Sequence, residues 1–226
     1  MYVQAVALRV LTWNLFHGRA LPPRDEDLRD AFATRLAGWT WDVALLQEVP
    51  PWWPEALAAA AGAQARWALT SRNQLAPLRR ALARRRPELM RSGGGGCNAI
   101  LVRGAITAHA RRRLRLRPER RVLHAVRDGA GRWFANVHAT VHDDELAGAD
   151  VALAWATALR WAAGAPLVLG GDLNLRAPEL PGFAHAGGHD VDHVFARGLE
   201  PAGAIEVLDR DGLSDHAPVR ATFAAA

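Results

Sequence analysis

Polar side chains recur at the ends of apolar segments along this chain of 226 residues. In LVLGGDLNL (167–175), an apolar run ends by presenting Asp172 and Asn174 almost side by side. Other apolar runs end at, or are flanked by, Asn14, Glu48, His138, Asp192, Asp215 and His216. One polar residue at a strand end is usually a turn or cap residue. The repetition of Asp, Asn, Glu and His at such ends instead predicts one shared site.

These residue types suit phosphate chemistry assisted by a divalent cation. Carboxylate and amide oxygens are the ligands that a hard cation such as Mg²⁺ prefers. Histidines beside carboxylates can transfer protons or stabilise a phosphate group. The single cysteine, Cys97, excludes an intrachain disulfide, and the sequence has no Cys/His spacing typical of structural zinc. A G-x-x-x-x-G-K-[ST] phosphate-binding loop is also absent.

Apolar runs and amphipathic segments are interspersed along the chain, which predicts a layered α/β or α+β fold. We expect strands over residues 6–14, 42–49, 97–104, 121–128, 131–141, 166–174, 190–198 and 216–224. We expect helices over residues 24–39, 50–62, 72–91 and 144–164. Several strands lack the crossover that parallel neighbours need, so the sheets should be partly antiparallel. Because no Pro/Ser-rich linker divides the sequence, one domain over residues 1–226 is expected.

The cationic residues are all arginine, and the formal net charge is +5. Arginine binds phosphate through two parallel hydrogen bonds and stacks on bases, so nucleic acid, phosphorylated small molecules or lipid headgroups are plausible partners. We expect the arginine runs at 79–86 and 111–117 to lie on a helix or a loop rim. There they would either face a phosphodiester backbone or form a solvated surface. Trp52 and Trp53, flanked by prolines, are candidates for exposed residues that stack on bases.

The N-terminal segment lacks the basic region and cleavage site of a signal peptide, and no apolar run reaches the roughly 18 residues of a membrane span. These features, together with the single cysteine, favour a cytoplasmic protein. We expect a monomer without a membrane span, and we predict no protein partner. Its substrate would be nucleic acid or a phosphorylated small molecule.

Six short segments occur in order between residues 11 and 219: LTWNL, LLQEV, NVHAT, GGDLN, VDHVF and LSDHAPV. Together they resemble the signature segments of the endonuclease/exonuclease/phosphatase superfamily, which includes deoxyribonucleases, exonuclease III-type repair nucleases, inositol polyphosphate 5-phosphatases and sphingomyelinases. The resemblance implies a four-layer α/β/β/α sandwich of two mixed, largely antiparallel β-sheets flanked by helices. It also implies hydrolysis of a phosphoester with Mg²⁺ or Mn²⁺ as the cofactor.

The resemblance assigns metal binding to three residues. Glu48 would be the principal ligand, and Asp215 would complete the metal-binding or water-orienting set. Asn14 would bind the metal through its amide oxygen or orient Glu48. Without the resemblance, each residue could be a turn or cap residue.

The resemblance also assigns catalytic roles. Asp172 would orient or deprotonate the attacking water, and Asn174 would donate to a phosphate oxygen in the transition state. His216, held by Asp192, would contact the scissile phosphate or protonate the leaving group, and His138 would bind phosphate. Two candidates for the general base stay open, namely Asp172 and the His–Asp pair.

Further side chains are weaker candidates. Arg121 matches a position at which many family members carry an arginine facing the cleft, although Arg120 could equally occupy it. His17 could reach the substrate, and Asn98 could approach the cleft. A second catalytic glutamate, found in some deoxyribonucleases, could be Glu88 or Glu119, but neither is clearly aligned.

Three functions fit these residues. The first is a metal-dependent nuclease or phosphodiesterase, which the arginine-rich surface favours. The second is a phosphatase or phosphodiesterase of a small or lipid-linked phosphate, such as an inositol phosphate. The third is a binding module with the same fold but without catalytic turnover. The only tyrosine is Tyr2, so the mid-chain catalytic tyrosine of some repair nucleases is missing.

Overall fold

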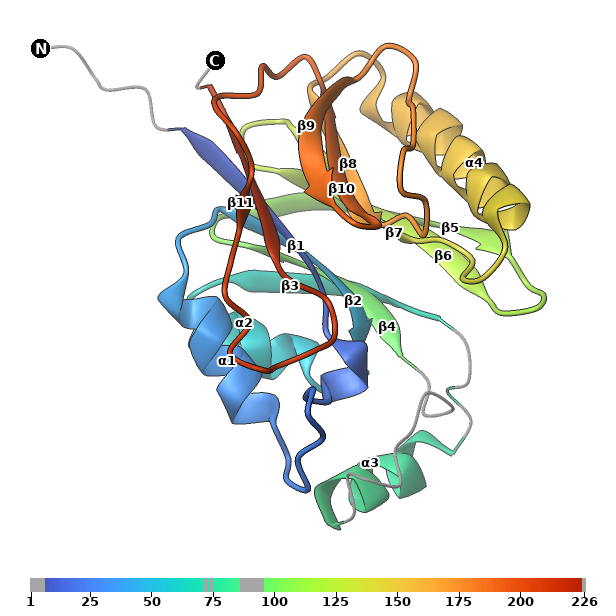
Figure 1. Cartoon of the computed structure of the whole chain (residues 1–226). Helices are drawn as coiled ribbons and strands as arrows, with labels where there is room; N and C mark the ends of the chain where they lie inside the picture. Colours follow the sequence, from blue (N-terminus) through green and yellow to red (C-terminus); the bar gives the residue numbers. More distant parts are fainter. Residues whose placement is uncertain (1–6, 71–72, 74, 86–95, 225–226) are drawn as a thin grey trace, which may run out of the picture.

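Two β-sheets pack face to face, and helices cover both outer surfaces, in the computed structural model of the chain (Figure 1). The structure describes residues 7–70, 73, 75–85 and 96–224. The expected four-layer α/β/β/α sandwich is therefore confirmed. Glu88 and the ends of the segment 72–91 lie outside the described residues, whereas its middle forms α3 (Ala76–Arg85).

The first sheet has six strands, and its outer face is covered by α1 (Arg29–Gly38) and α2 (Pro54–Ala60). Only β1 and β2 are parallel; the remaining neighbours are antiparallel. The segment containing α1 makes the crossover that this parallel pair requires. The strand order is β11 (Glu206–Val207), β12 (Val219–Phe223), β1 (Leu8–Asn14), β2 (Val43–Val49), β4 (Cys97–Val102) and β3 (Gln64–Leu69).

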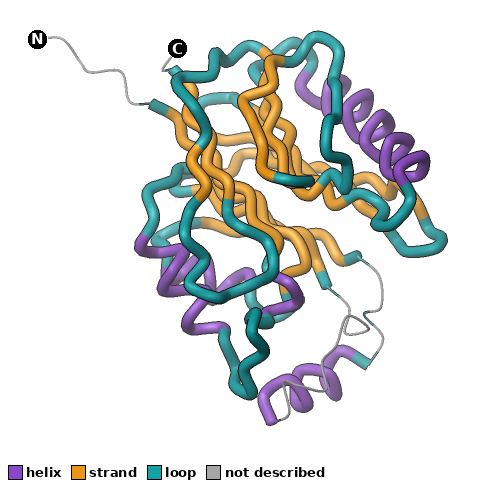
Figure 2. The backbone as a smooth tube through the Cα atoms, in the orientation of Figure 1, coloured by secondary structure: helices purple, strands orange, loops and turns teal. Residues whose placement is uncertain are grey.

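The second sheet also has six strands, and the long helix α4 (Asp144–Ala162) lies on its outer face (Figure 2). The Asp143 side chain caps this helix by accepting from the Leu146 amide at 2.9 Å. Helix α4 connects β7 to β8, which form the parallel pair of this sheet. The strand order is β5 (Ile106–Arg115), β6 (Arg121–Asp128), β7 (Trp133–His138), β8 (Leu167–Asp172), β10 (Asp192–Arg197) and β9 (Ala184–His189).

Apolar side chains fill the space between the sheets and the space beneath the helices on each side. Polar contacts also cross between the sheets, and several of them involve Asn136. The Asn136 amide on β7 donates to the carbonyl oxygens of Leu46 and Ala99, both at 2.9 Å, and accepts from Gln47 at 2.8 Å. These bonds fix β7 against the first sheet just before both β2 and β7 end. Nothing in the local sequence pattern indicated this contact.

Strand direction brings several chain segments to one edge of the sandwich. The parallel pairs β1–β2 and β7–β8 end at this edge. β12, β6 and β10 begin there, because each runs antiparallel to one of those four strands. Residues from seven strand ends or starts, distant in sequence, therefore meet at this edge.

Some sequence expectations were wrong. Strands β3, β5, β9 and β11 were not predicted. The four arginines between residues 111 and 115 lie on edge strand β5 rather than on a helix or loop rim. Arginines on an edge strand reach water from either face, so the apolar alternation that reveals a strand is missing. The helix expected from residue 24 begins only at Arg29. None of the described helices is long and apolar enough to cross a membrane.

The two tryptophans expected to stack on bases belong to the core instead. Trp53 is 4% exposed, and its ring centroid lies 5.5 Å from that of Phe32 on α1. Trp52 is half-buried and packs against the same apolar cluster. The proline-rich approach to α2 turns these rings beneath the helices, so that prediction is wrong.

Candidate active site

A cleft of about 440 Å³ opens at the edge where the strand ends meet. Eight of the nine predicted site residues line it: Asn14, Glu48, Arg121, His138, Asp172, Asn174, Asp215 and His216. The ninth, Asp192, is buried behind His216. The fold thus brings these nine residues together.

Asp172 lies at the centre of the site and is held from both sides. Its Oδ2 atom accepts from the Asn14 amide at 2.9 Å, and its Oδ1 atom accepts from the backbone amide of Asn174 at 3.1 Å. The Nε2 atom of His138 lies 3.4 Å from Oδ2. Burial raises the pKa of Asp172, whereas His216 and the hydrogen bonds from Asn14 and Asn174 oppose this shift. The carboxylate therefore has a fixed orientation in the cleft.

The glycines before Asp172 permit a close approach of neighbouring chains. Gly171 has a φ of 138°, and a Cβ atom there would lie 1.9 Å from the Val137 carbonyl oxygen. At Gly170, a Cβ atom would lie 2.9 Å from the His193 carbonyl oxygen. Larger residues would push β8 away from β7 and β10, so the GGD sequence sets where the carboxylate stands.

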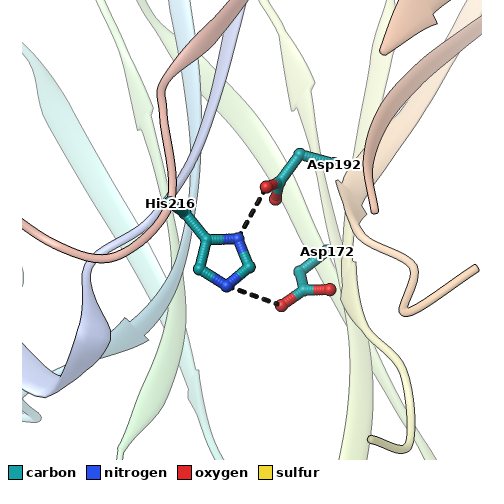
Figure 3. Close-up of side chains that lie close together, drawn as sticks. All are labelled: Asp172, Asp192 and His216. Atoms are coloured by element: carbon teal, nitrogen blue, oxygen red, sulfur yellow. Dashed lines mark hydrogen bonds and ion pairs between the residues drawn. The ribbon is translucent and has the colours of Figure 1, made fainter. Parts of the chain in front are cut away.

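His216 lies between two carboxylates, as Figure 3 shows. Its Nδ1 atom is 2.6 Å from Asp192 Oδ2, and its Nε2 atom is 3.9 Å from Asp172 Oδ2. Burial lowers the pKa of His216, but Asp192, followed by Asp172 and Asp215, outweighs burial and raises the pKa to about 9. The ring is therefore an imidazolium at neutral pH, with one N–H directed at Asp192.

Ser214 supports the loop that carries His216, and the sequence analysis did not single it out. Its hydroxyl donates to the Asn14 carbonyl at 2.6 Å and accepts from the His216 amide at 3.1 Å. Its φ of 65° is in the left-handed region, which serine seldom occupies. The segment LSDH contained this serine, but nothing in the local pattern indicated a bond to the end of β1.

Glu48 enters the cleft from β2 at a point where the pairing with β4 is irregular. Its φ of 50° turns the side chain out of the strand. Oε2 lies 3.0 Å from His17 Nε2, and Oε1 lies 4.0 Å from His138 Nε2. Burial, and then the charge of Asp172, raise the pKa of Glu48 to about 7. His17, a weak candidate for substrate contact, therefore contacts Glu48.

The donor set in the cleft fits a hard divalent cation. Asp172 and Asp215 both raise the pKa of Glu48, so these three carboxylates repel one another, and a cation bound among them would offset this repulsion. Asn14 directs its amide nitrogen at Asp172, while its oxygen accepts from the Phe16 amide at 2.9 Å. It therefore holds Asp172 rather than Glu48. Any metal contact by Asn14 would use the remaining lone pair of its oxygen.

A second arrangement of ligand atoms is also compact. Atoms of Asp172, Asp192 and His216 lie within 4.8 Å of one another. The Nδ1 atom of His216 already bonds to Asp192, however, and the imidazolium form offers no lone pair. This group is better described as a hydrogen-bonded network than as a metal centre.

The phosphate-binding candidates surround this centre. Arg121 is paired with Glu119 at 2.9 Å, and its Nε atom has no partner among the described residues. Asn174 has a φ of 50° and donates its side-chain amide to the Ala139 carbonyl at 3.1 Å. One amide hydrogen of Asn174 thus remains for a ligand. Arg120 also lines the cleft and donates to the Leu69 carbonyl.

The weaker candidate Asn98 and the neighbour of Asp192 point away from the cleft. Asn98 is fully buried and donates to the Val122 carbonyl at 3.1 Å, so it joins the two sheets. His193, which follows Asp192 and faces the other way on β10, bonds to the Leu175 carbonyl at 2.9 Å.

Comparison with known families agrees with this geometry. The model of the Endonuclease/Exonuclease/phosphatase family matches residues 11–216. The chain belongs to this family. Its members typically hydrolyse phosphoesters with a divalent metal, and the match includes all nine predicted site residues. No curated protein sequence matches the chain.

Several solved structures share the fold. An endonuclease/exonuclease/phosphatase from Beutenbergia cavernae superimposes with a TM-score of 0.71 at 20% identity, covering 97% of this chain and 72% of that one. The human Nocturnin catalytic domain superimposes with a TM-score of 0.69 at 16% identity, and the match covers 97% of this chain and 95% of that domain. TDP2 from Caenorhabditis elegans superimposes with a TM-score of 0.68 at 16% identity, and the match covers 99% of this chain and 76% of that one. At these identities the likeness concerns the fold alone.

Proposed function

We propose that this protein is a divalent-metal-dependent phosphodiesterase that acts on nucleic acid. The observation that carries the proposal is the position of Asp172, which is fixed by Asn14 and the Asn174 amide and flanked by His138 and His216. A carboxylate held beside two histidines can act on a water molecule while the histidines contact a phosphate. The human Nocturnin structure contains a bound sulfate anion, a tetrahedral analogue of phosphate.

Mg²⁺ or Mn²⁺ would be held by Glu48 and Asp215, with the Asn14 oxygen as a further donor. When bound, the ion would neutralise charge on the phosphate and raise its reactivity. The remaining chemistry belongs to side chains of this chain, which orient the reactants and move protons.

Asp172 is the proposed proton acceptor for the attacking water. The raised pKa of His216 keeps this ring protonated at neutral pH, so it has no lone pair with which to accept the proton of the water. As the water oxygen bonds to phosphorus, its proton passes to Asp172 and the bond from phosphorus to the leaving oxygen breaks. The Nε2–H of His216 donates to the phosphate or to the leaving oxygen, and Asp192 holds the ring for this step.

His138, Asn174 and Arg121 are the proposed phosphate-binding residues. Burial, followed by the charges of Arg121 and His216, lowers the pKa of His138 well below its ordinary value, so this ring is neutral and can donate one N–H. The free amide hydrogen of Asn174 and the guanidinium of Arg121 add donors around the same cleft. Such preorganised donors stabilise the negative charge that grows in the transition state.

The first test is metal-dependent hydrolysis by the wild type and by Asp172→Asn. The substrates are bis(p-nitrophenyl) phosphate, p-nitrophenyl phosphate and a labelled DNA. We expect cleavage of the diester and of DNA that requires Mg²⁺ or Mn²⁺ and falls by about 10²–10⁴-fold in Asp172→Asn, because the amide cannot accept the proton. Asp30→Asn, an exposed substitution on α1, should retain wild-type activity.

The other possible outcomes separate the competing functions. Hydrolysis of the monoester alone would indicate a phosphatase and contradict the proposal. Binding of DNA without turnover under any metal condition would indicate a binding module. Diester cleavage that persists in Asp172→Asn would remove Asp172 from the proposed mechanism.

A further inference from the structure

The free edges of the two sheets beside the cleft are rich in arginine. Strand β3 and the segment from Ile106 to Arg117, which includes β5, together contain six arginines and no acidic residue. β3 and β5 are each the last strand of their sheet on the same side of the sandwich, where they pack near one another. Positive charge is therefore concentrated along this side of the molecule.

Strand geometry divides these arginines into two sets. Arg112 is opposite Leu123, whose side chain packs beneath α4, and its guanidinium donates to Thr157 on that helix at 3.1 Å. Arg115 also turns toward α4, where it pairs with the buried Asp150 at 2.9 Å. These two arginines therefore belong to the packing of α4 against the second sheet.

Arg111 and Arg113 point the other way. They are opposite His124 and Val122, which lie on the face of β6 that is turned toward the first sheet. There they approach β3, whose Arg66 is exposed. Arg66, Arg111, Arg113 and Arg117 have no carboxylate partner among the described residues, and we refer to these four as the basic edge.

Two arginines of the basic edge lie close enough to a neighbouring histidine, His109, to lower its pKa. The pKa of His109 is lowered by burial and then by the charges of Arg66 and Arg111. No carboxylate contributes to this shift. A surface with spare guanidinium groups and no opposing acid is suited to an anionic ligand.

The basic edge is continuous with the cleft. Arg115 is opposite Arg121, which lines the cleft, and Arg113 and Arg111 are paired with positions one and three residues further along β6. At about 3.3 Å per residue, the paired arginines extend roughly 10 Å from the cleft wall. Arg120 connects the cleft to β3, because it lines the cleft and donates to the Leu69 carbonyl at the end of that strand.

We propose that the basic edge binds the backbone of a single-stranded nucleic acid and leads it into the cleft. This inference rests on the proposed phosphodiesterase function and adds to it the substrate class and the path of the chain. Arg111 and Arg113 are two residues apart on one strand face, so their Cα atoms are about 6.6 Å apart along the strand, which is close to the spacing of successive phosphates in an extended single strand. Binding would be independent of base sequence, because these contacts are to phosphates.

The geometry favours a single strand over a duplex or a small phosphate. A duplex presents two lines of phosphate separated by a groove about 12 Å wide, whereas the basic edge offers one line of cations. A small phosphorylated substrate would fill the cleft and leave this line without a ligand. We therefore expect affinity to rise with oligonucleotide length beyond what the cleft itself can hold.

The experiment measures binding by fluorescence anisotropy, with labelled thymidine oligonucleotides of four and twelve residues in EDTA, from 50 to 200 mM salt. Wild type should bind the 12-mer more tightly than the 4-mer. Arg111→Gln/Arg113→Gln should weaken 12-mer binding, remove the length dependence and reduce the slope of log K against log salt by about 1.4, or about 0.7 per phosphate contact. Arg111→Lys/Arg113→Lys should retain most of the affinity, which shows that the strand still folds.

Arg112→Gln/Arg160→Gln is the matched control. It removes the same charge from the opposite face, where both guanidinium groups bond to Thr157. We expect this variant to bind like the wild type. Equal weakening by both double variants would show that net charge alone matters and would overturn the proposal. Equal affinity for 4-mer and 12-mer, or stronger binding to a duplex or to anionic phosphatidylserine vesicles, would also overturn it.

This test is independent of catalysis. Hydrolysis of bis(p-nitrophenyl) phosphate depends on the cleft alone, so Arg111→Gln/Arg113→Gln should hydrolyse it at the wild-type rate. If the wild type hydrolyses the diester but Arg111→Gln/Arg113→Gln binds the 12-mer as tightly as the wild type does, only this inference is contradicted. Tight, length-dependent oligonucleotide binding without any hydrolysis would contradict only the proposed function.

Discussion

A buried histidine next to the basic edge gives a quantitative prediction about stability and pH. His124 on β6 is fully buried between the sheets, and its Nδ1 atom lies 3.3 Å from Nε2 of His109. Its own Nε2 atom has no partner among the described residues. Burial, followed by the charge of His109, lowers the pKa of His124 to about 3. The folded protein therefore keeps this ring neutral.

The sign and size of the effect follow from proton linkage. In the unfolded chain this histidine titrates near its ordinary value of 6.5. Below that pH the unfolded state binds more protons than the folded state, so stability is lost as the pH falls from about 6.5 toward 3. Between pH 7 and pH 5 the loss attributable to His124 is about 2 kcal/mol.

Urea denaturation of the wild type and of His124→Leu at pH 7 and pH 5 measures the loss of stability that His124 causes. The free energy of unfolding of the wild type should fall relative to that of the variant by about 2 kcal/mol between the two pH values. Val126→Ala removes core volume without a titrating group, so its difference from the wild type should not depend on pH. A wild-type-minus-variant difference that is the same at both pH values would refute the assignment of a neutral, buried His124.

Two further substitutions test how the site is supported. Gly171→Ala would place a methyl group against the Val137 carbonyl and should destabilise the protein by at least about 3 kcal/mol. Gly148→Ala lies on α4, where the added methyl group would have no atom within 4 Å, and should stabilise the protein by about 0.5–1 kcal/mol. Thermal melts of both variants check this contrast. Asp150→Ala would leave the guanidinium of Arg115 without its buried partner and should reduce the free energy of unfolding by about 3–5 kcal/mol in urea titrations, and a loss below 1 kcal/mol would contradict the structural role of this pair.

Much of the candidate site could be predicted because its residues occupy strand ends. A buried strand is visible as an apolar run, and the polar residue that ends it is visible in the same few positions. Parallel neighbours end at the same edge, so a set of such residues was expected to converge even before strand order was known. Asn14, Glu48, His138 and Asp172 follow this logic, and the structure places all four in one cleft.

Other features depend on residues far apart in sequence. The sequence alone determined that this chain contains strands ending in acidic, amide and histidine side chains and a run of arginines at 111–117. Only the tertiary structure decided that Asn14 holds Asp172, 158 positions away, and that Trp53 packs inside. It also decided which arginines of the run contact α4 and which face the first sheet. Local periodicity does not specify which face of an edge strand is covered, because a helix or strand from elsewhere in the chain supplies that cover.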